Sequence, residues 1–332
     1  MRLIKVFIGM IKYILTFLFL VLTFITFSQD VSFSQINNNK LYLNPAFTNS
    51  RIHPELTMSY RNQWPSIGNT YVTSVVSYEQ SLLGKNNGFG LLMMNDRSAN
   101  GIYSLNSVNL YFSNQQKINN NLNVKFGLEL GYKQNFIDTD KLFFEDSFNG
   151  QSFTTMTSEP LMNGLRVHYF DIGGGVILFN KKGYIGFATN HLNEPNQSLI
   201  FGESYLPMKF GLHGGLNIEV NKYAYVEEHL VYMPSFSLVR QGEFTELTVN
   251  NNIKKGKFLF GGGFRLVEGY SYRDAIIFNF GVDTGDLVFY YGYDFTVSSL
   301  GPNTGGAHEI TAVIKINQRP QKNKIIVPSC VF

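Results

Sequence analysis

The sequence is poor in cysteine, in charge and in long apolar runs. Its single cysteine, Cys330, excludes an intrachain disulfide and a thiolate metal cluster. Charged residues make up 15% of the 332 residues, whereas soluble domains have roughly 25%. Beyond residue 28, no apolar stretch is long enough for a transmembrane helix. The sequence therefore indicates neither a disulfide-stapled scaffold nor a helical membrane protein.

Basic charge is less abundant than the formal net charge of +3 suggests. Arg2, Lys5 and Lys12 all precede the first acidic residue, Asp30. Without these three, the 27 basic residues fall to 24, which equals the 24 acidic residues. We therefore expect no nucleic-acid partner.

The first 28 residues have the organisation of a secretory signal peptide. Basic Arg2 and Lys5 precede an apolar run from Tyr13 to Phe27, and we expect cleavage before Gln29. The boundary has no cysteine, so a lipoprotein anchor is not expected. An uncleaved N-terminal helix is the alternative, although the run is short for a membrane span.

Aromatic residues are abundant, with 30 Phe and 19 Tyr, and many alternate with small or polar residues. The clearest example is 275–296, where two alternating arms flank a turn at 283–286. Period-two alternation predicts a β-hairpin. Each arm has about 9–11 residues, enough to cross a bilayer at a tilt. One face of the hairpin is apolar and aromatic: Ile276, Phe278, Phe280, Val282, Leu287, Phe289, Tyr291, Tyr293 and Phe295.

Similar segments recur along the chain and predict about 14 antiparallel strands, an even number in the range of outer-membrane barrels. One of them, 223–233, places Glu228 on its apolar face, where we expect a bulge, a position near the rim or a covering protein contact. The expected strands are 55–62, 70–80, 88–95, 102–114, 121–136, 165–179, 183–191, 207–220, 223–233, 243–251, 257–266, 275–283, 287–296 and 307–317.

Loop lengths distinguish a membrane barrel from a soluble sandwich. A barrel with a periplasmic N-terminus has a short connection at every second position, whereas a sandwich has no reason to sort its loops. We therefore expect an all-β, transmembrane, antiparallel up-and-down barrel in the outer membrane of a Gram-negative cell. The short connections are 84–86, 116–120, 180–182, 221–222, 252–256 and 284–285, and the longer ones are 137–164, 190–206, 234–242 and 297–306.

The barrel is expected to cover 55–317, between a periplasmic or plug segment at 29–54 and a periplasmic tail at 318–332. We expect a plugged or narrow lumen with 29–50 as the candidate plug, and an open lumen is the alternative. The inward face carries both signs of charge, which suits internal salt bridges more than a selective pore. Its charged or titratable residues are Lys125, Glu129, Lys133, Asp171, Lys209, His213, Glu219, Arg265, Asp283, Asp294, Glu309 and Lys315.

No catalytic or metal-binding motif stands out. His308 and Glu309 lack the second histidine of a zinc-protease motif, and on a strand they point to opposite faces. No local nucleophile motif selects His168, His191 or His213 as a catalytic base. We expect neither enzyme activity nor a cofactor.

Four short motifs occur in order: FSQ at 33–35, LYLNPAF at 41–47, RNQW at 61–64 and GAHEI at 306–310. With the leader, they resemble the PorP/SprF family, outer-membrane proteins of the type IX secretion system of Bacteroidetes. The resemblance covers the whole mature chain. One departure is the C-terminal end, where family members often have a Cys-Pro-containing tail and this chain has Pro328-Ser329-Cys330.

The resemblance implies a non-enzymatic protein that supports secretion or surface anchoring of cargo. The cargo would be exported proteins such as adhesins with a C-terminal sorting domain, and some family members serve gliding motility. Envelope components of the type IX machinery and outer-membrane lipid are the other expected partners. The alternatives are an outer-membrane diffusion channel or hydrophobic-substrate transporter, and a barrel enzyme that acts on lipid.

Candidate plug- or partner-binding residues come from these motifs and from one loop. Asn44 and Pro45 are expected to fix a turn in the plug, with an ordinary loop proline as the alternative. The first strand ends near Arg61, Gln63 and Trp64, which extend into the first outer loop. Trp64 is expected either in the interfacial aromatic belt or packed with Arg61 on the plug or a partner. Exposed aromatic residues of the loop 137–164 are expected to contact a partner: Phe143, Phe144, Phe148 and Phe153.

Overall fold

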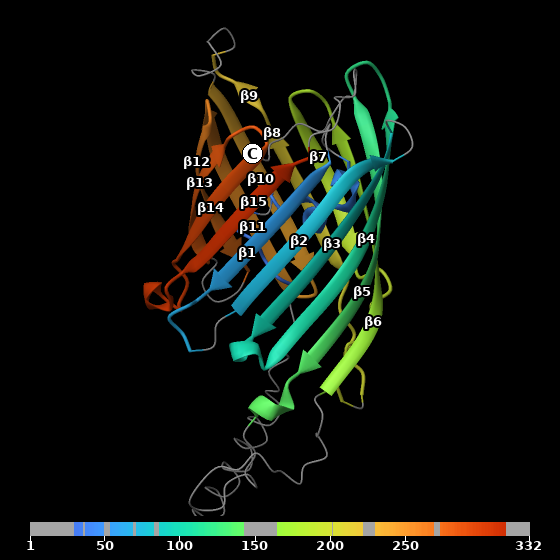
Figure 1. Cartoon of the computed structure of the whole chain (residues 1–332), viewed down its shortest axis with the longest axis vertical. Helices are drawn as coiled ribbons and strands as arrows, with labels where there is room; N and C mark the ends of the chain where they lie inside the picture. Colours follow the sequence, from blue (N-terminus) through green and yellow to red (C-terminus); the bar gives the residue numbers. More distant parts are fainter. Residues whose placement is uncertain are drawn as a thin grey trace, which may run out of the picture.

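The computed structural model describes residues 30–35, 37–49, 54–68, 71–82, 86–142, 165–200, 202–221, 230–268 and 273–316. It is an all-β structure with very little helix (Figure 1). In these ranges, no helix is long and apolar enough to cross a membrane. The short helices are α2 (Lys40–Leu43), η1 (Pro45–Phe47), η2 (Ala99–Gly101), η3 (Thr139–Lys141) and η6 (Pro302–Thr304). The strands are β1 (Glu55–Gln63), β2 (Tyr71–Leu82), β3 (Asn87–Ser98), β4 (Tyr103–Lys117), β5 (Asn123–Ile137), β6 (Leu165–Phe179), β7 (Gly183–Asn190), β8 (Lys209–Leu216), β9 (Ile218–Glu219), β10 (Leu230–Gln241), β11 (Phe244–Lys255), β12 (Phe258–Val267), β13 (Ala275–Asp283), β14 (Leu287–Thr296) and β15 (Ala307–Lys315).

The strands form one closed antiparallel sheet. Neighbours in the sequence are neighbours in the sheet, and β15 pairs with β1 over the whole of β1. The sheet has 15 strands, but β8 and β9 lie one after the other along β10 and fill a single place. The predicted up-and-down barrel of about 14 strands is therefore confirmed.

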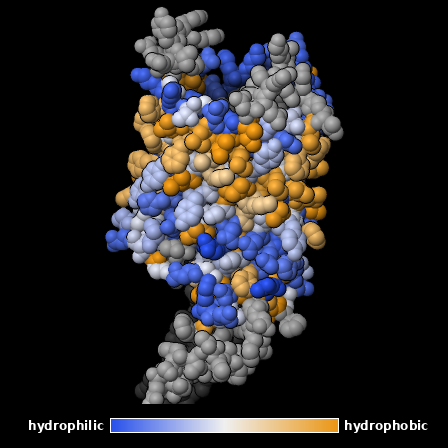
Figure 2. Space-filling view, viewed as in Figure 1, coloured by the Kyte–Doolittle hydropathy of each residue, from blue (hydrophilic) through white to orange (hydrophobic). Residues whose placement is uncertain are grey.

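Exposure along the strands has the opposite sense to that in a soluble protein. On β5, Leu128 is 64% exposed and Phe126 is 53% exposed, whereas the inward side chain of Lys125 is 0% exposed. Apolar residues gather in a band across the visible face, with hydrophilic residues above and below it (Figure 2). An apolar outer face around a polar interior is the arrangement of a barrel that spans a membrane.

The connections sort by length between the two ends of the barrel. The outer end, at the bottom of Figure 1, is the end at which β1 finishes, and the inner end is the opposite one. At the inner end, 118–122, 180–182 and 284–286 are short, whereas 138–164 and 191–208 at the outer end are long. The predicted alternation holds for most connections.

The prediction was wrong around Pro234. The sequence suggested a loop at 234–242, whereas β10 runs on to Gln241 and a two-residue turn follows. Pro234 lies opposite the break between Leu216, the last residue of β8, and Ile218, the first of β9. Because proline has no N–H to donate, it is tolerated at such an interruption of the ladder.

Two neighbouring expectations also change. The strand predicted at 223–233 begins at Leu230 among the described residues, and Glu228 lies outside them. The turn predicted at 252–256 is shorter, because β11 continues to Lys255. Gly256 then has a φ of 57°, a conformation that glycine adopts without strain.

Residues 30–35 and 37–49, here called the lumenal segment, lie inside the barrel. Asn37 donates to the Ser235 hydroxyl of β10 at 2.6 Å, and Asn39 accepts from the Ser59 hydroxyl of β1 at 2.8 Å. The segment is also packed hydrophobically, since Phe33 is 0% exposed. It therefore contacts strands on different sides of the lumen.

The lumenal segment runs from the outer end to the inner end. The Asp30 N–H donates to Gln241 at the outer end of β10, at 3.0 Å. Asn49 donates to the carbonyl of Asn87, the inner-end residue of β3, at 2.9 Å. The first described residue is therefore at the end opposite to the start of β1.

Asn44 and Pro45 fix a turn close to the barrel wall. Pro45 is the first residue of η1, and the Asn44 side chain accepts from the Ala46 N–H at 2.8 Å. The same side chain donates to the Phe187 carbonyl of β7 at 3.1 Å. A Cβ added to Gly127 of β5 would lie 2.2 Å from the Ala46 nitrogen. Only glycine at position 127 allows the backbone of the turn to approach so closely.

We expect Gly127→Ala to destabilise the barrel, because the new methyl group collides with backbone atoms of the turn. Overpacking of this kind costs about 1–3 kcal/mol. The measurement is the temperature at which the folded, heat-modifiable band disappears on a gel. Gly174→Ala is the matched control, since its Cβ would meet only the Gly127 carbonyl oxygen, at 3.6 Å. Equal unfolding temperatures for Gly127→Ala and the wild type would contradict the proposed fit.

Candidate functional site

The outer half of the lumen holds a network of ion pairs centred on Arg61. Its guanidinium lies 3.1 Å from Asp294 of β14 and 3.2 Å from Glu309 of β15. Arg265 of β12 also pairs with Asp294, and with Asp274 at 2.6 Å. Arg61 is directly opposite Glu309 in the sheet, so the barrel register brings these charges together. The internal salt bridges expected from the sequence are thus present.

The lumenal segment is bound into this network. The N–H groups of Ser34 and Gln35 donate to the two oxygens of Glu309, at 2.8 and 3.3 Å. Arg61 also donates to the Ser34 hydroxyl, and Arg265 donates to the Ser32 hydroxyl at 3.2 Å. A buried carboxylate is stable only when charges and donors compensate it. Glu309 therefore gains donors from the segment while the segment gains acceptors from the wall.

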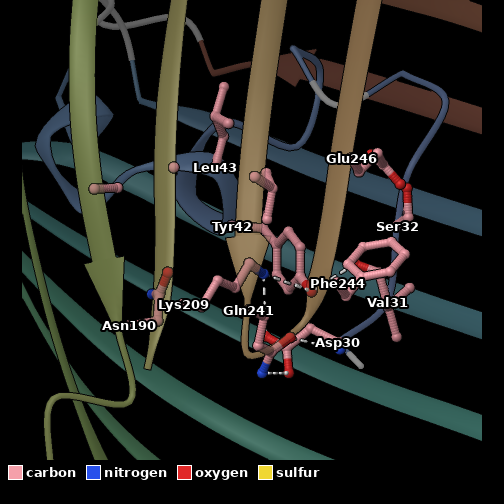
Figure 3. Close-up of a pocket in the computed structure, with 13 residues that line it drawn as sticks. Asp30, Val31, Ser32, Tyr42, Leu43, Asn190, Lys209, Gln241, Phe244 and Glu246 are labelled. Atoms are coloured by element: carbon pink, nitrogen blue, oxygen red, sulfur yellow. Dashed lines mark hydrogen bonds and ion pairs between the residues drawn. The ribbon is translucent and has the colours of Figure 1, made fainter. Parts of the chain in front are cut away.

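A second charged cluster holds the beginning of the segment. The Asp30 carboxylate lies 3.0 Å from Lys209 and 3.1 Å from His191, which follows β7. His191 in turn lies 2.9 Å from Asp171. Figure 3 shows Asp30 beside Lys209 and Gln241 on neighbouring strands.

These contacts change how Asp30 and His191 titrate. Burial acts to raise the pKa of Asp30, but the charges of Lys209 and His191 outweigh it and hold that pKa well below its ordinary value. Burial acts to lower the pKa of His191, but the nearby Asp30 and the hydrogen bond to Asp171 outweigh it and raise that pKa. Both groups therefore favour their charged forms, although Lys133 nearby acts in the opposite direction on His191.

Between the lumenal segment and the outer rim, the barrel contains a cavity of about 490 Å³, here called the outer vestibule. Its lining includes Asp30, Val31 and Ser32 of the lumenal segment together with Arg61 and Arg265 of the wall. The rest of the lining is aromatic, acidic, neutral polar or aliphatic and comes from the outer ends of several strands: Gln63, Trp64, Tyr71, Thr73, Asp96, Ser98, Tyr103, Phe244, Glu246, Val267 and Asp274.

Trp64 has an unusual backbone conformation at the vestibule wall. Its φ is 55°, which is rare for a bulky residue. Its N–H donates to the Gly306 carbonyl at 2.7 Å, and its ring meets Tyr71 edge-on at 5.6 Å. Strain of this kind persists only where surrounding contacts impose it, and it is concentrated at functional sites.

The structure brings together some of the candidate residues and separates others. Arg61, Gln63 and Trp64 all line the outer vestibule. Asn44 and Pro45 lie deeper in the lumen, against β5 and β6. The loop aromatics fall outside the described residues: Phe143, Phe144, Phe148 and Phe153.

Several vestibule residues were not identified from the sequence. Tyr71, Tyr103 and Phe244 each begin a strand at the outer end, and Asp96 lies near the end of β3. The sequence signal that could have identified them is their shared position at the outer ends of predicted strands. In the described ranges, no group of histidine, cysteine and carboxylate side chains is arranged to hold a metal ion.

Comparison with known proteins gives a family match. Residues 25–314 match the family described as type IX secretion system membrane protein PorP/SprF. A search of the curated proteins found no match.

Several solved barrels are similar at low sequence identity. A CymD monoaromatic hydrocarbon channel is 13% identical, with 86% of this chain and 94% of that chain covered and a TM-score of 0.44. The P. putida toluene transporter TodX is 10% identical, with coverages of 83% and 93% and a TM-score of 0.47. A KdgM porin in complex with disordered oligogalacturonate is 9% identical, with coverages of 79% and 99% and a TM-score of 0.36.

The Asp30–His191 pair should give the barrel a pH-dependent stability. Asp30 contributes fully above its unfolded pKa of about 3.9 and loses this as the pH falls through its lower folded pKa. His191 contributes fully below its unfolded pKa of about 6.5 and loses this as the pH rises through its raised folded pKa. We therefore expect Asp30→Asn to lower the thermal midpoint most near pH 6 and least near pH 9.

The control for this pH series is Asp286→Asn, which changes an exposed carboxylate in the turn after β13. Its effect on the thermal midpoint should not follow the same profile. An effect of Asp30→Asn that is constant from pH 6 to pH 9 would contradict the coupling to His191.

Proposed function

Because this chain belongs to the PorP/SprF family of type IX secretion system membrane proteins, we propose that it supports the secretion or surface anchoring of exported proteins. The family and the barrel place it in the outer membrane as a component of that system. Both are of non-enzymatic kinds. The cargo is proposed to be proteins such as adhesins that carry a C-terminal sorting domain, and gliding motility is one process that they would serve.

The observation that carries the proposal is a rigid barrel with an aromatic and charged cavity at its outer end. We assign docking of cargo or of a partner protein to this end. Trp64 and Gln63 line the vestibule, while a closed antiparallel wall and the ion pairs of Arg61 fix their positions. Preorganised groups of this kind bind with little loss of side-chain freedom. The loop 137–164 and the surrounding outer-membrane lipid are proposed as further contacts.

The lumenal segment is proposed to act as a plug. It crosses the lumen from Asp30 to Asn49, contacts opposite walls and buries Phe33 and Phe47. A lumen filled in this way does not suit free diffusion of solutes. This supports a role in protein docking over a role as a diffusion channel.

Replacement of Trp64 tests the docking role. We expect Trp64→Ala to reduce the surface proteins that depend on this barrel, because the aromatic wall of the vestibule is lost while the salt bridges remain. Those proteins are first identified by comparing the surface proteomes of wild-type and deletion strains. Phe289→Ala, which changes an outward aromatic of β14, is the control. Wild-type surface levels in Trp64→Ala would contradict the docking role.

Arg61 requires a different expectation. Arg61→Ala leaves Asp294 and Glu309 without one of their buried partners and frees Ser34. Breaking a buried ion pair costs about 3–5 kcal/mol. The amount of folded barrel in the outer membrane should therefore fall together with the displayed cargo, whereas Trp64→Ala should spare the barrel. Quantifying the barrel in both variants separates the two effects.

The plug is tested by conductance. Purified protein reconstituted in planar bilayers should show little steady current, because the lumenal segment occupies the pore. An open porin reconstituted in parallel is the positive control. A large, stable single-channel conductance of the wild-type protein would contradict the plug and would favour the diffusion channel.

A further inference from the structure

Two carboxylates at the outer vestibule form no direct ion pair in the described ranges. Asp96 of β3 accepts from the Thr73 hydroxyl at 2.6 Å, and Glu246 of β11 accepts from the Thr248 hydroxyl at 3.2 Å. Both line the cavity. Most other lumenal carboxylates near this end are matched by a lysine, an arginine or a histidine. Asp96 therefore presents negative charge that no described cation neutralises by direct contact. Glu246 adds to this charge, although Arg265 lies close enough to attract it.

The arginines of the vestibule do not offer a free positive charge. Arg61 is shared between Asp294 and Glu309, and Arg265 is shared between Asp294 and Asp274. An incoming anion would have to compete with these buried pairs and would meet Asp96 and Glu246 as well. The charge of the cavity therefore favours a cation. A recessed, low-dielectric site increases that attraction, because its walls focus the field.

The walls of the vestibule are aromatic at the same level. Trp64, Tyr71, Tyr103 and Phe244 contribute to its lining. A cation close to an aromatic face gains about 0.5–2 kcal/mol, with tryptophan the best partner. The chain already uses this interaction near the outer end of β8, where the Lys209 ammonium lies 4.4 Å from the centre of the Tyr42 ring. Carboxylates and aromatic faces together form a binding site for an organic cation.

We propose that the outer vestibule binds a lysine or arginine side chain of a polypeptide, with Asp96 and Glu246 as its charge partners and Trp64 as its aromatic wall. The volume of about 490 Å³ admits one such side chain with its neighbouring residues. The choice of a polypeptide over a free organic cation rests on the proposed function, which brings exported proteins to this end. The structure thus assigns a basic element to the docking segment of the partner.

The test uses Trp64 as its own reporter, because it is the only tryptophan in the chain. The full mature protein in detergent is titrated with acetyl-Gly-Lys-Gly-amide and acetyl-Gly-Arg-Gly-amide while its tryptophan emission is recorded. We expect a saturable change in emission that weakens as salt is added, since ion pairs that water reaches are screened. Acetyl-Gly-Glu-Gly-amide should give no saturable change.

Neutral isosteres test the two carboxylates. Asp96→Asn and Glu246→Gln should each weaken binding of the lysine peptide by about tenfold, which is typical of a lost hydrogen bond to a charged group. Asp286→Asn, remote at the inner end, should leave the affinity unchanged. A gel assay for heat-modifiability shows whether each variant is folded. The salt series uses the wild-type protein alone and therefore tests the site even if a variant fails to fold.

Three outcomes would overturn the cation site. They are equal binding of the acidic peptide, no saturable change with either basic peptide, and a neutral oligosaccharide such as maltoheptaose binding in their place. The result is independent of the surface-proteome test. Failed peptide binding with cargo loss in Trp64→Ala would remove only the cation site, whereas peptide binding without cargo loss would remove the proposed function.

Discussion

Backbone hydrogen bonding inside a lipid bilayer is the constraint on which the rest of this structure depends. Hydrocarbon offers no partners to N–H and C=O groups, so a spanning sheet must have no open edge. Pairing of β15 with β1 along all nine residues from Glu55 to Gln63 removes the last edge. Once the sheet is closed, each residue faces either lipid or lumen. Every group available for specific recognition is therefore inside the barrel or at one of its ends.

The polar interior creates a second requirement, because charges removed from water must be compensated. The wall meets part of this requirement through the pairs of Arg61 and Arg265 with carboxylates on β14 and β15. The lumenal segment meets another part by directing the N–H groups of Ser34 and Gln35 at Glu309. Segment and wall thus stabilise each other. Asp96 and Glu246 form no direct ion pair with the residues that the structure describes, and both line the vestibule, where water has access.

Alternation made most of the barrel predictable from the sequence. Segments such as β5 and β14 have uninterrupted period-two patterns, and short turns at one end fixed their direction. The strand around Pro234 was missed because a proline was read as a loop signal, although the break between β8 and β9 accommodates it. The sheet accepts Pro234 because the neighbouring strand is interrupted there, and the sequence around Pro234 does not reveal that interruption.

The candidate site was less predictable than the fold. The motif at 61–64 was recognised, but its residues have different environments, since Arg61 is buried in ion pairs and Trp64 lines a cavity. The partners Tyr103 and Phe244 come from strands far away in the sequence. Their proximity follows from the tilt and stagger of the whole sheet, which local patterns do not encode.

The direction of the lumenal segment also constrains how the molecule is assembled. Asp30 contacts Gln241 at the outer end, Asn49 contacts Asn87 at the inner end, and β1 begins at that same inner end. The lumenal segment is enclosed once β1 pairs with β15. The segment also contacts both strands of the closing pair, because Ser34 binds Arg61 of β1 and Glu309 of β15. Docking of the segment and closure of the ring therefore stabilise each other.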